Sequence, residues 1–164
     1  MKWVKQSIHY WCPDTKEHKF LGQNVTVAIL DTGISPHPDF KGRILSFRDF
    51  SNTTGSSEKD LFSFSHSLPL IDNSGHGTHV AGILAGSGLL SSGAYAGIAP
   101  FCDLIIGKVL DQNGNGSIKN VINGIQWIHD IYTQFHIRII NISVGTRPDL
   151  SIHQNLLLFN AVES

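Results

Sequence analysis

Three short apolar runs, each ending at a polar turn, constrain the fold of this chain more than any other feature. The runs span residues 25–30, 104–110 and 137–142 and are rich in β-branched side chains. Continuous apolar runs of this length are typical of parallel strands that are buried on both faces. With a further short strand expected at residues 43–47, the chain is predicted to contain a mainly parallel sheet.

Helical patterns separate these runs. A helix expected at residues 76–86 has small side chains that would allow close packing against a neighbour: Ala81, Gly82 and Ala85. Ser117 is a good N-cap for an amphipathic helix with apolar side chains at Ile118, Val121, Ile122, Ile125, Ile128 and Tyr132. Ser151 would cap a last helix that carries Ile152, Leu156, Phe159 and Val162. Strands that alternate with helices indicate an α/β fold with both sheet faces covered.

Composition bounds the size of the core and the class of partner. The 164 residues are 41% hydrophobic with a formal net charge of -1, which suits one buried core and does not indicate a nucleic-acid or membrane partner. Because no apolar run is long enough for a signal peptide or a membrane span, we expect a cytoplasmic location. Cys12 and Cys102 are expected to be reduced thiols, since their spacing matches no zinc motif and defines no disulfide.

We divide the chain into an N-terminal arm, residues 1–21, and one domain, residues 22–164. The arm mixes aromatic and charged side chains and is expected to be irregular or partly helical. Within the domain, residues 49–72 are rich in Ser, Asn, Thr and Gly, which predicts a long surface excursion between the strands and the helix that follows.

His76 is the most chemically suggestive residue of the chain. It lies between Gly75 and Gly77 at the expected start of a helix, where glycine allows the backbone to bend and another group to approach closely. The positive end of the helix dipole disfavours an imidazolium, so we expect His76 to be neutral near pH 7 and able to accept a proton. A capping or core histidine is the plainer interpretation of His76 taken alone.

Polar residues follow the apolar runs at what would be the carboxyl edge of the sheet, where α/β folds bind ligands. Asp31 begins an Asp-Thr-Gly turn that also occurs in aspartic proteases, but those need an all-β chain and a second such carboxylate. His76 and His79 could ligate a metal, although their spacing differs from His-Glu-x-x-His. The third interpretation pairs Asp31 and His76 as the orienting carboxylate and the base of a Ser-His-Asp triad.

The third interpretation gains weight from longer segments. Residues 28–34 (Ala-Ile-Leu-Asp-Thr-Gly-Ile), 37–40 (His-Pro-Asp-Phe) and 75–82 (Gly-His-Gly-Thr-His-Val-Ala-Gly) resemble, in chain order, the aspartate and histidine boxes of the subtilisin-like serine proteases. The resemblance implies a three-layer αβα sandwich, here incomplete at its C-terminus, and a serine-type endopeptidase. It also implies that Asp31 orients the imidazole of His76 and that His76 moves the proton.

The same resemblance implies a polypeptide substrate held between two strand edges. One edge would be formed by Gly114, Asn115 and Gly116, and the other by Ser143, Val144 and Gly145. We assign no metal-binding residue and no certain cofactor. Asp39 lies where the family often has a calcium ligand, so the resemblance allows calcium without requiring it, and a loop aspartate that caps its own backbone is an equal alternative.

The family's nucleophile box, Gly-Thr-Ser-Met-Ala, and the asparagine of the oxyanion hole have no counterpart in residues 1–164. We therefore expect this chain alone not to cleave peptides measurably. The strand at 137–142 is expected to present an unpaired edge, through which the chain would self-associate or pair with a missing C-terminal half. A non-catalytic protein that binds peptides or other partners through the retained cleft is the alternative.

Overall fold

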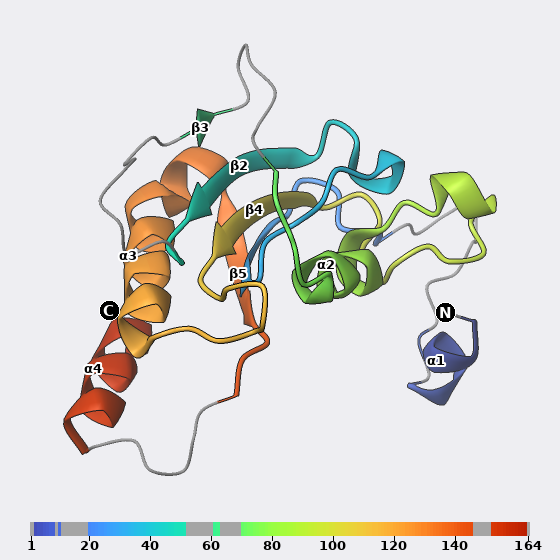
Figure 1. Cartoon of the computed structure of the whole chain (residues 1–164). Helices are drawn as coiled ribbons and strands as arrows, with labels where there is room; N and C mark the ends of the chain where they lie inside the picture. The colour runs from blue at the N-terminus through green and yellow to red at the C-terminus, as the bar shows by residue number, and fades with distance from the viewer. Residues whose placement is uncertain are drawn as a thin grey trace.

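A five-stranded sheet lies at the centre of the described part of the chain (Figure 1). A computed structural model describes residues 2–8, 10, 20–51, 61–62, 70–145 and 152–163. The strands are β1 (Thr26–Asp31), β2 (Ile44–Asp49), β3 (Leu61–Phe62), β4 (Asp103–Lys108) and β5 (Ile137–Ile142). The helices are α1 (Lys2–Ser7), α2 (His76–Ala85), α3 (Ile118–Phe135) and α4 (Ile152–Glu163), with short 3-10 helices at Pro38–Phe40 and Leu89–Ser91.

The strand order is β3-β2-β4-β1-β5, and each pair except β2 with β3 is parallel. β1 lies between β4 and β5, with Asp31 in register with Lys108 and Leu30 with Ile142. The carboxyl ends of these three strands therefore meet at one edge of the sheet. The predicted mainly parallel sheet is confirmed, and the four expected strands end within two residues of their predicted bounds.

The side chains of β1 alternate between two cores. Val27 and Ile29 belong to the cluster that contains the small side chains of α2, whereas Ala28 and Leu30 belong to the cluster beneath α3. Figure 1 shows α2 and α3 on opposite sides of the sheet. Alternation of this kind explains why the run at β1 is apolar throughout, because neither of its faces meets water. The expected three-layer arrangement is confirmed.

The prediction for α2 holds for two of its three small residues. Ala81 and Ala85 are fully buried against the sheet, as expected. Gly82 is only half-buried, and a Cβ atom built on it would meet no other atom within 4 Å. In a helix residue 82 is turned by about 100° from residue 81, so it leaves the face that packs on the sheet.

The α3 prediction is correct in its start and needs one correction on its apolar face. The Ser117 hydroxyl oxygen accepts a hydrogen bond from Asn120 N at 3.1 Å, which confirms the predicted N-cap. Tyr132 was expected on the buried face but is 52% exposed, and its ring stacks on His129. Ile131 is buried in its place, because the helical repeat carries the packed face from residue 128 to 131.

The predicted N-terminal arm is partly helical, with α1 at its start. Tyr10 Oη donates a hydrogen bond of 2.5 Å to Ile98 O, which joins the arm to the loop before β4.

Cys102 is a free, buried thiol whose pKa is raised by burial to about 11. Cys12, the cap at Ser151 and most of the excursion at 49–72 lie outside the described residues, apart from the short strand β3. Among the described helices, none is long and apolar enough to span a bilayer.

β5 forms one edge of the sheet in the described part of the chain. Two of its apolar side chains, Ile139 and Ile140, are 53% and 41% exposed. The burial of β5 thus contrasts with that of β1, whose six residues are all buried. An edge strand with exposed isoleucines is a template for pairing with a further strand.

Candidate active site

Asp31 is the last residue of β1 and is fully buried. Its carbonyl oxygen accepts hydrogen bonds from Val109 N at 2.9 Å and Leu110 N at 3.2 Å, which fix the strand end against the segment after β4. Its Oδ1 accepts a hydrogen bond from Thr32 N at 2.7 Å. Among the described residues its buried Oδ2 has no hydrogen-bond partner, so the interactions of this carboxylate are concentrated on Oδ1.

His76 is the first residue of α2, and its Nδ1 lies 2.7 Å from Asp31 Oδ1. The structure thus brings the two predicted catalytic residues into direct contact although 45 positions separate them. An ionised carboxylate can only accept a hydrogen bond, so Nδ1 carries the proton and Nε2 is left as the basic nitrogen of the ring. About half of the imidazole is exposed, which makes a proton transfer to a bound molecule sterically feasible.

The direction of the pKa shift of His76 is opposite to the expected one. The hydrogen bond that His76 donates to Asp31 and the charge of that carboxylate raise the pKa of His76 above its ordinary value, and the charge of Asp72 adds to this effect. From the sequence alone, the helix dipole was expected to disfavour the imidazolium. The full negative charges of two nearby carboxylates favour the protonated imidazole at short range.

The predicted roles of the two glycines around His76 are confirmed. Gly75 has a φ of 85°, a left-handed conformation that lets the chain turn into the helix. A Cβ atom on Gly77 would lie 2.2 Å from Gly33 O, so the backbone of α2 touches the turn after β1 directly. Gly33 is equally confined, since its Cβ would lie 2.0 Å from Ile71 O. These approaches bring His76 within reach of Asp31.

Two polar residues of this site, Asp72 and Lys108, were not predicted from the sequence. Lys108 is only 5% exposed, and its ammonium donates hydrogen bonds to Thr32 O at 2.6 Å and Leu110 O at 2.8 Å. It therefore ties together the turns that follow β1 and β4. A lysine at the end of an apolar strand run was the available signal for Lys108, and an aspartate just before a helix start was the signal for Asp72.

The two predicted substrate edges follow the strands on either side of β1. Gly114, Asn115 and Gly116 are exposed and come after β4, while Ser143, Val144 and Gly145 come after β5 and are exposed or half-buried. The Asp111 carboxylate shapes the first edge by accepting hydrogen bonds from the backbone N–H groups of residues 113 and 115. In the second edge, Ser143 Oγ accepts a hydrogen bond from Asn141 Nδ2 at 2.9 Å. Their role in binding peptide stays a prediction.

The surroundings of Asp39 do not suit a calcium ion. Its Oδ2 accepts a hydrogen bond from Gly88 N at 3.0 Å and its Oδ1 one from Leu90 N at 3.3 Å. Calcium requires six to eight oxygen ligands, whereas here the backbone turns N–H donors toward the carboxylate. The loop aspartate serves as a cap, although for the backbone of residues 88–90 rather than its own.

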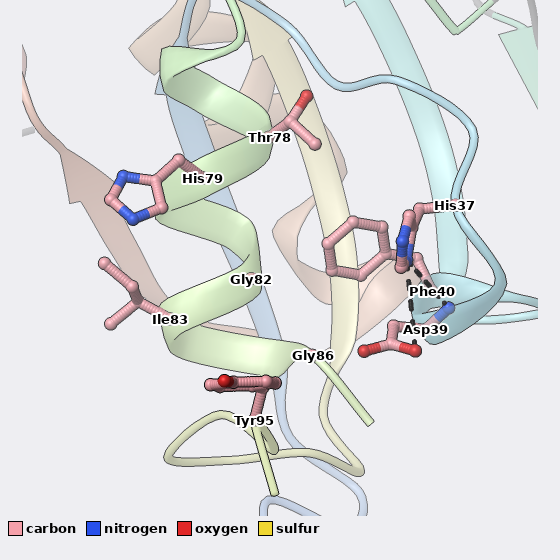
Figure 2. Close-up of a pocket in the computed structure, with 9 residues that line it drawn as sticks. All are labelled: His37, Asp39, Phe40, Thr78, His79, Gly82, Ile83, Gly86 and Tyr95. Atoms are coloured by element: carbon pink, nitrogen blue, oxygen red, sulfur yellow. Dashed lines mark hydrogen bonds and ion pairs between the residues drawn. The ribbon is translucent and has the colours of Figure 1, made fainter. Parts of the chain in front are cut away.

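Asp39 also lines a pocket of about 360 Å³ on the outer side of α2 (Figure 2). His79 lines the same pocket, but its ring points away from His37 and Phe40. The described residues contain no group of three His, Cys, Asp or Glu side chains that could hold a metal. The interpretation of His76 and His79 as metal ligands therefore has no support from this part of the chain.

No described serine forms a hydrogen bond with His76, whose side-chain partner is Asp31. Ser143, the serine that follows β5, bonds to Asn141 instead. The described residues thus contain a contact between His76 and Asp31, the predicted base and its predicted orienting carboxylate, without a serine beside them.

Comparison with known proteins identifies a family and several relatives with similar sequences. Residues 22–162 match the model of the Subtilase family. The chain is 44% identical over 106 residues to the serine protease AprX of Bacillus subtilis (strain 168), a match that covers 65% of this chain and 21% of AprX. It is 39% identical over 131 residues to the major intracellular serine protease of the same organism, covering 79% and 36% of the two chains.

Solved structures show the same similarity. The structure of sphericase matches with a TM-score of 0.69 and 29% identity, over 92% of this chain and 44% of the sphericase chain. The chain thus spans about a fifth to under a half of the length of these proteins.

Proposed function

The chain belongs to the subtilase family, and from this premise we propose that it supplies the acid–base half of a serine endopeptidase. The observation that carries the proposal is the 2.7 Å contact between His76 Nδ1 and the buried Asp31 carboxylate. This contact fixes the tautomer in which Nε2 is free to take a proton. The aspartic-protease alternative loses its basis, because the Asp-Thr-Gly turn here follows a parallel strand of an α/β sheet.

In the proposed reaction, His76 Nε2 removes the proton of a serine hydroxyl while the serine oxygen attacks the carbonyl carbon of a peptide bond. The imidazolium that forms is stabilised by the negative charge of Asp31. His76 then gives this proton to the amine that leaves, and water completes the cycle through the same base. The serine and the oxyanion donors come from polypeptide outside these 164 residues.

The substrate of this proposal is an extended polypeptide. Residues 114–116 and 143–145 follow the strands that flank β1, so a peptide lying between them would pass over the carboxyl end of the strand that carries Asp31. Gly114 N and both backbone groups of Asn115 are already hydrogen-bonded to Asp111, so such a peptide would pair with the remaining backbone groups of the two segments.

The proposal is tested by restoring the missing half. The chain would be joined after Ser164 to the part of the major intracellular serine protease that lies beyond the aligned region, and hydrolysis of a chromogenic peptide would be measured. We expect hydrolysis by the fusion and none by the chain alone. Substituting His76→Ala should abolish the activity, as in subtilisin, where loss of the histidine is known to cost about a millionfold in kcat.

A matched control uses His79→Ala, because His79 is exposed on the same helix and forms no hydrogen bond with Asp31 or His76. This variant should keep the activity of the fusion. Labelling by a fluorophosphonate, which reacts with an activated serine, should follow the same pattern. Steady hydrolysis by the 164-residue chain alone, lost on His76→Ala, would contradict the assignment of the nucleophile to another segment.

A second candidate is a non-catalytic protein that binds peptides between the same two segments. It is supported by the two segments that follow β4 and β5, which could hold a peptide without any nucleophile. If a peptide shifts the NMR signals of residues 114–116 and 143–145 while the fusion remains inactive and unlabelled, this candidate replaces the first.

A further inference from the structure

Asp72 lies in the loop before α2, four residues ahead of His76, and caps the start of that helix. Its Oδ1 accepts hydrogen bonds from Ser74 N at 3.1 Å and Gly75 N at 2.9 Å, and its Oδ2 accepts one from Thr78 N at 2.9 Å. The N-cap position itself is Gly75, which has no side chain to offer. One carboxylate from outside the helix therefore satisfies backbone donors that would otherwise be free.

The same carboxylate orients two threonine hydroxyls. Thr32 Oγ1 donates to Asp72 Oδ1 at 2.8 Å, and Thr78 Oγ1 donates to Asp72 Oδ2 at 2.6 Å. A hydroxyl has a single hydrogen, so each threonine oxygen can meet its other neighbours only as an acceptor. Asp72 thereby decides which way both hydroxyls face.

Each oriented hydroxyl accepts a backbone N–H from the opposite element. Thr32 Oγ1, in the turn after β1, accepts from Gly77 N of α2 at 2.9 Å. Thr78 Oγ1, in α2, accepts from Ser35 N of the loop after β1 at 2.9 Å. The two bonds run in opposite directions between the same two elements, which resists both separation and sliding of the helix start relative to the strand end.

These bonds lie next to the proposed catalytic pair in the chain. Thr32 follows Asp31 and Gly77 follows His76, so the bond from Gly77 N to Thr32 Oγ1 runs beside the contact between His76 and Asp31, one residue further along. A change in the position of Thr32 or Gly77 is passed directly to the pair through the backbone.

We propose that Asp72 is a positioning residue, which acts through Thr32 and Thr78 to hold the start of α2 at the distance that lets His76 contact Asp31. The role rests on the proposed function, because the pair it positions is the proposed base and its orienting carboxylate. Asp72 does not touch the reacting atoms.

The charge of Asp72 fits this role. Partial burial alone would raise the pKa of this carboxyl, but the hydrogen bonds from Thr78, Gly75 and Thr32 outweigh burial and lower the pKa to about 2. The residue is thus an acceptor at both oxygens throughout the neutral range. An asparagine of the same shape would turn an N–H₂ group toward donors, so one side of the arrangement would lose its acceptor.

The first test is Asp72→Asn in the 164-residue chain, with the imidazole of His76 followed by NMR. We expect the pKa of His76 to fall toward its ordinary value and the Nδ1–H signal to broaden or disappear, because the contact with Asp31 loosens. Asp39→Asn is the matched control, since Asp39 also accepts two backbone N–H groups but in a loop that does not touch the pair. It should leave the signals of His76 unchanged.

A second pair of variants separates positioning from the bare charge of Asp72. Thr32→Val removes the bridging hydroxyl and keeps the carboxylate, whereas Thr32→Ser keeps the hydroxyl. Positioning requires that Thr32→Val reproduce the loss of the Nδ1–H signal and that Thr32→Ser restore it. If Thr32→Val leaves the pKa and the Nδ1–H signal of His76 as in the parent chain, the proposal is overturned, even where Asp72→Asn fails to fold.

These readouts need neither a nucleophile nor a substrate. An inactive fusion protein would therefore remove the proposed endopeptidase function without altering the NMR result, and an unperturbed His76 in Thr32→Val would remove the role of Asp72 without altering the activity of the fusion.

Discussion

Substitution of Gly77 by alanine should separate α2 from the end of β1. Gly77 is the second residue of α2, and an added Cβ would lie 2.2 Å from Gly33 O and 3.2 Å from the Cβ of Asp31. Both neighbours belong to the main chain or to its first side-chain atom, so neither can rotate away. The start of the helix must move by about 1 Å to reach ordinary contact distances.

The expected cost follows from three contributions. Overpacking of this kind costs about 1–3 kcal/mol, and weakening the hydrogen bond from Gly77 N to Thr32 Oγ1 adds about 1 kcal/mol. The higher helix propensity of alanine offsets up to about 1 kcal/mol. We therefore expect Gly77→Ala to lower the free energy of unfolding by roughly 2 kcal/mol.

Gly82→Ala is the matched control, because the same substitution in the same helix places a Cβ where no atom lies within 4 Å. It should raise the free energy of unfolding by about 0.5–1 kcal/mol. Urea unfolding followed by circular dichroism measures both variants, and NMR of His76 should show a lowered pKa only in Gly77→Ala. Equal stability of the two variants would refute the close approach on which the site geometry depends.

Three further predictions concern charge, metal and association. The pKa of Asp72 is lowered from 3.8 to about 2 in the folded chain, so its contribution to stability is present above about pH 4 and is lost as the pH falls toward 2. Over this range the free energy of unfolding should fall by about 1 kcal/mol from this residue, after allowance for its solvent exposure. Asp72→Asn should make the free energy of unfolding depend less on pH over the same range. A chelator should leave the midpoint of thermal unfolding unchanged, whereas Asp39→Asn should lower it; a downward shift with the chelator would show that a metal stabilises the fold. Sedimentation should show that Ile139→Lys with Ile140→Lys reduces self-association of the chain, and unchanged association would exclude the β5 edge as its route.

The local patterns of the sequence were sufficient for the fold class. The apolar runs predict β1, β4 and β5 because burial on both faces removes the need for polar alternation, and Ser117 marks the start of α3 because a hydroxyl there satisfies a free backbone donor. The segments at residues 28–34 and 75–82 likewise point to Asp31 and His76 as a candidate pair, and the fold brings the two side chains into contact. The prediction was wrong where the burial of a side chain depends on its exact angle around the helix axis. Tyr132 was predicted on the buried face of α3, but its side chain is exposed.

The tertiary structure alone decided how the site is held together and charged. The direction of the pKa shift of His76 depends on Asp31, which is 45 positions away in the sequence and in contact with the imidazole in the fold. The role of Asp72 depends on hydroxyls at positions 32 and 78, which join a strand end to a helix start. Sequence periodicity records which side chains avoid water, whereas hydrogen bonds and pKa values arise from groups that only folding brings together.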